Sequence, residues 1–160
     1  MKKGWIPALA VAVALDQLAK MWADRVLPAH PGGALAAWPG VFGWQYAKNT
    51  GAAFSAMSGR QLLLIIVTSA LIAGALLYLT FNRDLARSPR LGLTLIAAGG
   101  LGNLIDRARN GYVIDYIKFL FVEFPIFNLA DIFITSGVTV IIIWLFATGG
   151  EQFGRKRLSD

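Results

Sequence analysis

Segment 61–82 contains no charged side chain over 22 residues. An apolar run of about 20 residues is long enough to cross the hydrocarbon core of a bilayer as one helix. The whole chain agrees with this interpretation, because 56% of its 160 residues are hydrophobic, only 15% are charged and its mean hydropathy is +0.58. Such a composition lacks the polar surface of a soluble domain. We therefore predict an integral membrane protein.

Three further segments are rich enough in apolar residues to span a membrane. Segment 127–148 contains one acid, Asp131, whereas segments 4–23 and 90–107 reach spanning length only if they include charged residues. Backbone groups inside a bilayer need internal hydrogen bonds, so each span is expected to be a helix. The sequence thus predicts an all-α integral membrane protein with four transmembrane helices, in a single membrane-embedded domain over 1–160.

Basic residues indicate the orientation of these spans. One set lies in the two termini and the short second connection: Lys2, Lys3, Arg83, Arg87, Arg90, Arg155, Lys156 and Arg157. A smaller set is spread over the two long connections: Arg25, Lys48, Arg60, Arg107, Arg109 and Lys118. Because cytoplasmic segments are enriched in Lys and Arg, we expect both termini in the cytoplasm. The first span resembles a signal peptide, but it carries Asp16 and Lys20 and lacks a clear cleavage site, so we expect it to be retained.

The two long outer connections contain segments typical of β-strands. Segments 41–46 (VFGWQY) and 112–118 (YVIDYIK) are rich in aromatic and β-branched residues. We expect the first to form strands lying on the membrane, as a small extracytoplasmic β-rich region (a β-cradle). The second extracytoplasmic loop would carry Asp115 on a strand or just beyond it.

Polar residues of three spans fall at their outer ends. They are Asp16, Lys20, Asn103, Asp106, Arg107, Asn128 and Asp131. Ionisable residues within a membrane span are costly, and they are usually paired or exposed to an aqueous cavity. We therefore expect these side chains to form a polar site near the outer leaflet.

Each of these residues also has a structural explanation. The dipole at the start of a helix would favour the Asp131 carboxylate. Asp16 and Lys20 are four residues apart and would form an ion pair within one helix. Asp106 and Arg107 would form a pair at the membrane interface. In segment 99–103 (GGLGN), which has no P-loop lysine, the glycines would allow close helix packing, leaving Asn103 to bind a neighbouring helix or a substrate.

Elimination restricts the hydrolytic chemistry that the chain could perform. It has no cysteine, and its single histidine, His30, cannot form a multi-histidine metal site. A serine–lysine arrangement would combine Ser55, Ser58 or Ser136 with Lys20 or Lys48. A pair of aspartates fits better, because one carboxylate can activate water while the other, protonated, donates to the scissile carbonyl. Such a pair needs no metal and no organic cofactor.

Five segments, in this order and spacing, resemble the lipoprotein signal peptidase family, also called signal peptidase II. They are 16–20 (DQLAK), 49–55 (NTGAAFS), 99–107 (GGLGNLIDR), 113–116 (VIDY) and 124–131 (FPIFNLAD). The resemblance implies that Asp115 and Asp131 are the catalytic pair. Other motif positions, which would shape the site or bind substrate, are occupied here by Asp16, Lys20, Asn49, Gly51, Asn103, Asp106, Arg107 and Asn128. Ile114 and Tyr116 stand where the family more often has valine and phenylalanine.

The resemblance also implies an activity. The chain would be a hydrolase, an aspartic endopeptidase of the bacterial cytoplasmic (inner) membrane that removes signal peptides in lipoprotein processing. Its substrate would be a prolipoprotein whose cysteine carries diacylglyceryl, cut on the amino side of that cysteine, with Asn49 and Arg107 gripping the substrate. Globomycin-type cyclic peptides would occupy the same cleft. The net charge of +6 is assigned to membrane orientation and anionic lipid, with no nucleic-acid partner, and nothing requires more than a monomer.

Two other functions remain open from the residues alone. A small transporter or proton-coupled channel would use the same buried charges, but its polar groups should run across the membrane. A structural subunit would use the glycine and alanine rows for helix packing, and would give Asp115 and Asp131 no role.

Overall fold

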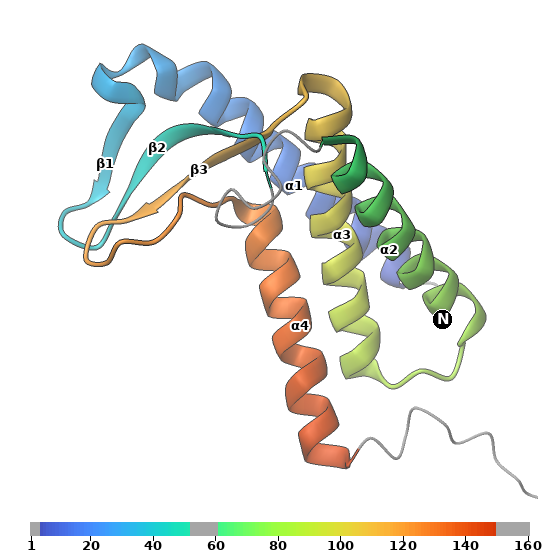
Figure 1. Ribbon diagram of the computed structural model, residues 1–160. Coiled ribbons are helices and arrows are strands. Elements are labelled where there is room, and N and C mark those ends of the chain that lie inside the picture. Colours follow the sequence, from blue (N-terminus) through green and yellow to red (C-terminus); the bar gives the residue numbers. More distant parts are fainter. Residues whose placement is uncertain (1–3, 52–60, 150–160) are drawn as a thin grey trace, which may run out of the picture.

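The computed structural model describes residues 4–51 and 61–149. Within these ranges the elements follow one another as α1 (Trp5–Val26), β1 (Ala34–Trp38), β2 (Phe42–Asn49), α2 (Gln61–Phe81), α3 (Arg87–Asn110), β3 (Val113–Phe119) and α4 (Leu129–Thr148). Two short 3-10 turns, Leu27–Ala29 and Pro31–Gly33, connect α1 to β1. Figure 1 shows the helices packed together and the strands gathered beyond one end of them.

Some residues considered above lie outside the described ranges. They are segment 52–55 of the second motif with Ser55, and also Ser58, Arg60, Lys2, Lys3, Arg155, Lys156 and Arg157.

Three helical segments within the described residues are long and apolar enough to cross a membrane. They are Trp5–Ala29, Gln61–Phe81 and Leu129–Thr148. Their outer faces expose large apolar side chains, and Phe146 on α4 is 87% exposed. Exposure of so many apolar side chains to water would be unfavourable, whereas lipid tails can solvate such a surface. The helices therefore fit a membrane protein.

The remaining long helix, α3, differs because it lies between the others and packs against α1, α2 and α4 (Figure 1). Its buried face consists largely of small residues: Gly92, Ala97, Ala98, Gly99, Gly100 and Gly102. Gly92 faces Gly137 of α4 so closely that a Cβ atom on either residue would collide with the backbone oxygen of the other. The glycines lower the hydropathy of α3, and the same glycines allow α3 to pack closely at the centre of the bundle.

The three strands form one antiparallel sheet in the order β1-β2-β3. The sheet packs on the end of α1, where Ala23 and Leu27 contact Ile114 and Tyr116 of β3. Strands were expected near β2 and β3 from their aromatic and β-branched residues. The first strand, β1, has the sequence ALAAW and was not expected, because its alanines carry no such signal.

The two ends of the bundle have different character. Figure 1 shows the start of α1, the α2–α3 connection and the end of α4 at the end far from the sheet. The basic residues Arg83, Arg87 and Arg90 belong to that connection and to the first turn of α3. The sheet and the buried acidic residues described next lie at the opposite end, near the end of β2 and the start of β3.

Candidate active site

Asp115 lies on β3, and its carboxylate is held by two amide side chains. The residue is only 3% exposed. Its Oδ2 accepts a hydrogen bond of 3.0 Å from Nδ2 of Asn49, the last residue of the neighbouring strand β2. Its Oδ1 accepts one of 2.6 Å from Nδ2 of Asn128. Two donors from separate segments therefore fix the position of the Asp115 carboxylate.

Asp131 lies in the first turn of α4, where it forms a reciprocal capping box with Asn128. Oδ1 of Asn128 accepts from the backbone N–H of Asp131 at 3.0 Å, and Oδ2 of Asp131 accepts from the backbone N–H of Asn128 at 3.1 Å. The other oxygen of Asp131 accepts a bond of 2.9 Å from Nδ2 of Asn103 on α3. Asp131 therefore stabilises the start of the helix and also faces a residue of the expected site.

Asn128 does not lie within the last helix, contrary to the predicted span 127–148. It has extended backbone angles (φ −136°, ψ 179°) and is the N-cap of α4. Asparagine is favoured there because its side chain satisfies an N–H group that the first turn leaves free.

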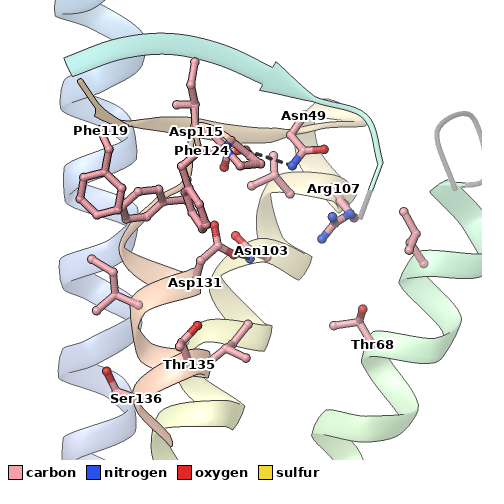
Figure 2. Close-up of a pocket in the computed structure, with 17 residues that line it drawn as sticks. Asn49, Thr68, Asn103, Arg107, Asp115, Phe119, Phe124, Asp131, Thr135 and Ser136 are labelled. Atoms are coloured by element: carbon pink, nitrogen blue, oxygen red, sulfur yellow. Dashed lines mark hydrogen bonds between the residues drawn. The ribbon is translucent and has the colours of Figure 1, made fainter. Parts of the chain in front are cut away.

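Both carboxylates line one cavity of about 600 Å³. Figure 2 shows Asp131 at the head of α4, below the strand that carries Asp115, with Asn103 beside it and Arg107 across the cavity. The rest of the lining is largely apolar: Leu64, Thr68, Val113, Phe119, Phe124, Pro125, Ile126, Phe127, Ile132, Ile134, Thr135 and Ser136, in addition to Asn49. A cavity of this kind can hold an apolar chain next to a small polar reaction centre.

The electrostatics couple the two aspartates. Burial and the negative charge of Asp131 raise the pKa of Asp115 to about 7, although the hydrogen bonds from Asn49 and Asn128 oppose this rise. Two carboxylates that line one largely apolar cavity cannot both ionise cheaply. Burial and the charge of Asp131 therefore favour the protonated form of Asp115.

A charged cluster, formed by Asp16, Lys20 and Asp106, lies behind this cavity. Nζ of Lys20 is 3.0 Å from Oδ2 of Asp16 and 3.0 Å from Oδ2 of Asp106, and all three side chains are almost completely buried. The predicted pair between Asp16 and Lys20 is present. Asp106, which the sequence suggested as the partner of Arg107, instead forms its ion pair with Lys20.

The charged cluster also holds the backbone beside each carboxylate of the cavity. Oδ1 of Asp16 accepts a hydrogen bond of 2.9 Å from the N–H of Ala130, the neighbour of Asp131. Oδ2 of Asp106 accepts one of 3.1 Å from the N–H of Ile114, the neighbour of Asp115. The start of α4 and the buried part of β3 are therefore anchored to the same three side chains.

Gln17 connects two members of the charged cluster, and sequence reasoning assigned it no role. Its Nε2 is 3.3 Å from Oδ2 of Asp16 and 3.1 Å from Oδ1 of Asp106. The same nitrogen donates to the backbone oxygen of Gly102 at 3.2 Å. The available signal was a polar residue directly after Asp16 in a largely apolar span.

Arg107, Gly51 and Asn49 form a second group at the edge of the cavity. Nη2 of Arg107 donates to the backbone oxygen of Gly51 at 2.8 Å, and the N–H of Gly51 donates to Oδ1 of Asn49 at 2.9 Å. This contact directs Nδ2 of Asn49 toward Asp115. Nε of Arg107 is buried and has no hydrogen-bond partner among the described residues.

The serine–lysine alternative is not favoured by the described residues. Ser136 lines the cavity, but Lys20 is bound within the charged cluster. Nζ of Lys48 lies 4.8 Å from the centre of the Tyr112 ring, on the sheet. Neither lysine lines the cavity with Ser136.

Comparisons with known proteins identify relatives over almost the whole chain. Residues 8–147 match the family described as Signal peptidase (SPase) II. A protein of Streptococcus thermophilus named Lipoprotein signal peptidase is 40% identical over 147 residues, covering 91% of this chain and 95% of the relative. A protein of the same name from Streptococcus pyogenes is 40% identical over 153 residues, covering 96% and 98%.

Two solved structures have the same fold, and both are described as bacterial membrane enzymes. The first superposes with a TM-score of 0.82 at 28% identity, covering 97% of this chain and 94% of that one. The second has a TM-score of 0.77 at 30% identity, covering 88% and 91%. From the family match and the full-length relatives together, we conclude that the chain belongs to the signal peptidase II family.

Proposed function

We propose that this protein is an aspartic endopeptidase that removes signal peptides from diacylglyceryl-modified prolipoproteins, with Asp115 and Asp131 as its catalytic pair. The cut falls on the amino side of the lipid-bearing cysteine. The family supports the removal of signal peptides from prolipoproteins. The observation that supports the mechanism most strongly is that carboxylates from β3 and α4 line one cavity with largely apolar walls.

In the proposed reaction the pair shares one proton, and Asp115 is its preferred site. Burial and the charge of Asp131 raise the pKa of Asp115 to about 7. Both oxygens of the Asp131 carboxylate accept hydrogen bonds, one from the Asn128 backbone and one from the Asn103 side chain, and this role as an acceptor suits the group that takes a proton from water. Asp131 is therefore the base and Asp115 the acid.

Each aspartate regains its starting protonation state by the end of the proposed reaction. Water lies between the two carboxylates and attacks the scissile carbonyl carbon while Asp131 takes its proton. Asp115 gives its proton to the carbonyl oxygen, which forms a neutral tetrahedral diol. When the carbon–nitrogen bond breaks, Asp131 protonates the leaving amine, and the diol returns its proton to Asp115. Neither metal nor organic cofactor takes part.

The lining of the cavity suggests how the substrate is held. The phenylalanines and the apolar residues of α2 and α4 suit the lipid of the modified cysteine and the hydrophobic part of the signal peptide. Nε of Arg107, which has no partner within the described part of the chain, can donate to a substrate carbonyl group, and Asn49 also lines the cavity. Globomycin-type cyclic peptides would compete for this space.

We infer the membrane placement from the same features. The helices α1, α2, α3 and α4 form four spans of one membrane-embedded domain, with α3 shielded from lipid by the other three. The arginines of the α2–α3 connection and both termini lie in the cytoplasm. The sheet and the aspartates lie at the outer leaflet of the bacterial inner membrane, and the protein acts as a monomer.

A transporter is less well supported. Among residues 4–51 and 61–149, the buried polar residues other than Thr94 belong to the cavity, the charged cluster or the capping box: Asp16, Lys20, Asn103, Asp106, Asp115 and Asn128. They gather at one end of the bundle and do not form a path across it. A purely structural subunit is also less well supported, because that function would give two aspartates in one cavity no role.

The experiment that tests the proposed function is direct. Purified protein is incubated with a diacylglyceryl-modified prolipoprotein and with the same precursor lacking the lipid, and the products are identified by mass spectrometry. We expect one cut, on the amino side of the modified cysteine, in the lipid-bearing precursor alone. Cleavage elsewhere, or equal cleavage of both precursors, would contradict the proposal.

A further inference from the structure

Lys20 is almost fully buried at 1% exposure, and it does not line the cavity. Its ammonium group has three N–H donors, and three acceptors surround it. Two are the carboxylates of Asp16 and Asp106, each at 3.0 Å. The third is Oδ1 of Asn103 on α3, at 2.8 Å. The lysine therefore connects the charged cluster to a side chain that reaches the proposed catalytic pair.

This contact determines which way the Asn103 amide points. An ammonium group can only donate, so the atom of Asn103 that faces Lys20 must be its oxygen. Nδ2 of Asn128 donates to the same oxygen at 3.2 Å. The nitrogen of Asn103 is consequently turned toward Oδ1 of Asp131, at 2.9 Å. A reversed amide would place N–H groups against the ammonium and an oxygen against the carboxylate, two repulsive contacts.

We propose that Lys20 is a positioning residue for the reaction: through Asn103, it ensures that an N–H donor, and not a carbonyl oxygen, faces the base Asp131. This inference rests on the proposed function of the Asp115–Asp131 pair. Asp16 and Asp106 serve as the counter-ions that allow Lys20 to be buried. The orientation of a catalytic carboxylate thus depends on a side chain on another helix that is almost fully buried and does not line the cavity.

The test must avoid a variant that only unfolds. Replacing Lys20 alone would leave two buried carboxylates without their counter-ion, which is strongly destabilising. The double variant Asp16→Asn/Lys20→Met leaves the formal net charge of the cluster unchanged and leaves one buried carboxylate, Asp106, without its counter-ion, although Asp106 still accepts hydrogen bonds from the N–H of Ile114 and from Gln17. An asparagine at position 16 still offers an oxygen to the N–H of Ala130. This pair is combined with Asn103→Leu, which removes the connection itself, to give a double-mutant cycle.

The cycle is measured as kcat and KM on a diacylglyceryl-modified prolipoprotein, with unfolding temperatures in detergent as the folding control. We expect Asp16→Asn/Lys20→Met to lower kcat about 100-fold with KM little changed, as for a misplaced catalytic group. In the Asn103→Leu background the same pair should change kcat by less than about threefold, because coupled residues are not additive. Equal losses in both backgrounds, or an unchanged kcat in the native background, would overturn the inference.

A second readout does not depend on activity. The ¹⁵N side-chain amide resonances of Asn103 are assigned by their disappearance in Asn103→Leu. They should shift in Asp16→Asn/Lys20→Met, whereas those of Asn82, in the α2–α3 connection, should not. If the Asn103 resonances stay unchanged, Lys20 does not orient this amide. If the native protein fails to cleave the precursor, the proposed function fails, and the resonances alone decide the role of Lys20.

Discussion

The side-chain amide of Asn128 donates a 2.6 Å hydrogen bond to Oδ1 of Asp115, a residue on another element and 13 positions earlier in the chain. Oδ1 of the same asparagine accepts from the backbone N–H of Asp131. One side chain therefore caps α4 with its oxygen and holds the acid of β3 with its nitrogen. Asn128 thereby links Asp115 of β3 to the start of α4, where Asp131 lies.

The two roles of Asn128 can be separated by substitution. Serine is a good N-cap, but its side chain is too short to reach Asp115. Asn128→Ser should therefore keep its unfolding temperature, whereas its kcat should fall about 10- to 100-fold. This fall corresponds to the free energy of one hydrogen bond to a charged group. Asn128→Ala should show the same loss of kcat and also about 1 kcal/mol of stability. Full activity of Asn128→Ser would show that the amide is only a helix cap.

The proposed acid makes activity depend on pH. The pKa of Asp115 is raised by burial and by the charge of Asp131 to about 7, and the reaction uses its protonated form. Raising the pH through this value removes that proton, so kcat should fall on the alkaline side with a midpoint near pH 7. Lys20 and Arg107 interact electrostatically with this pair. A kcat that is constant from pH 6 to 9 would contradict the assignment of Asp115 as the acid.

The close contact of α3 with α4 should be sensitive to a single methyl group. A Cβ on Gly99 would collide with the backbone oxygen of Ala130, next to Asp131. We expect Gly99→Ala to cost about 1–3 kcal/mol of stability and to lower kcat by separating Asn103 from Asp131.

Gly74, on α2, is the matched control for this substitution. A Cβ at Gly74 would meet no atom within 4 Å, so Gly74→Ala should be neutral or stabilising by up to about 1 kcal/mol. Thermal unfolding in detergent compares the two variants, and equal losses would show that the α3–α4 contact is not specifically close at Gly99.

The mechanism requires no metal ion, so chelation should have no effect. We expect EDTA and dipicolinate to leave the cleavage rate unchanged after prolonged incubation and desalting. Loss of activity that is restored by zinc would indicate a metalloenzyme and would exclude the proposed roles of Asp115 and Asp131.

Much of the local structure could be predicted because its signals are local. The apolar runs predicted helices close to α2 and α4, and the aromatic and β-branched residues indicated strands near β2 and β3. The four-residue spacing of Asp16 and Lys20 predicted an ion pair within one helix, which the structure contains. Each of these predictions used only residues within one element.

The relations between elements could not be predicted in the same way. Lys20 also binds Asp106 and Asn103, more than 80 positions away, and no spacing within α1 indicates those partners. Asp106 was expected beside Arg107, but helix geometry turns adjacent residues to different faces. Arg107 instead donates to a backbone oxygen of Gly51, which carries no side-chain signal. The catalytic assignment itself came from the family resemblance and remains a prediction.

The central claim is that Asp115 and Asp131 activate the water, and single-turnover cleavage of a diacylglyceryl-modified prolipoprotein tests it most directly. The variants are Asp115→Asn and Asp131→Asn, with Asp84→Asn as the control because Asp84 is an exposed acid in the α2–α3 connection. We predict that both site variants fold and bind the precursor but cleave at least about 10³-fold more slowly, the scale of losing a general acid or base, whereas Asp84→Asn cleaves at the native rate. Native cleavage by either folded site variant would contradict the account.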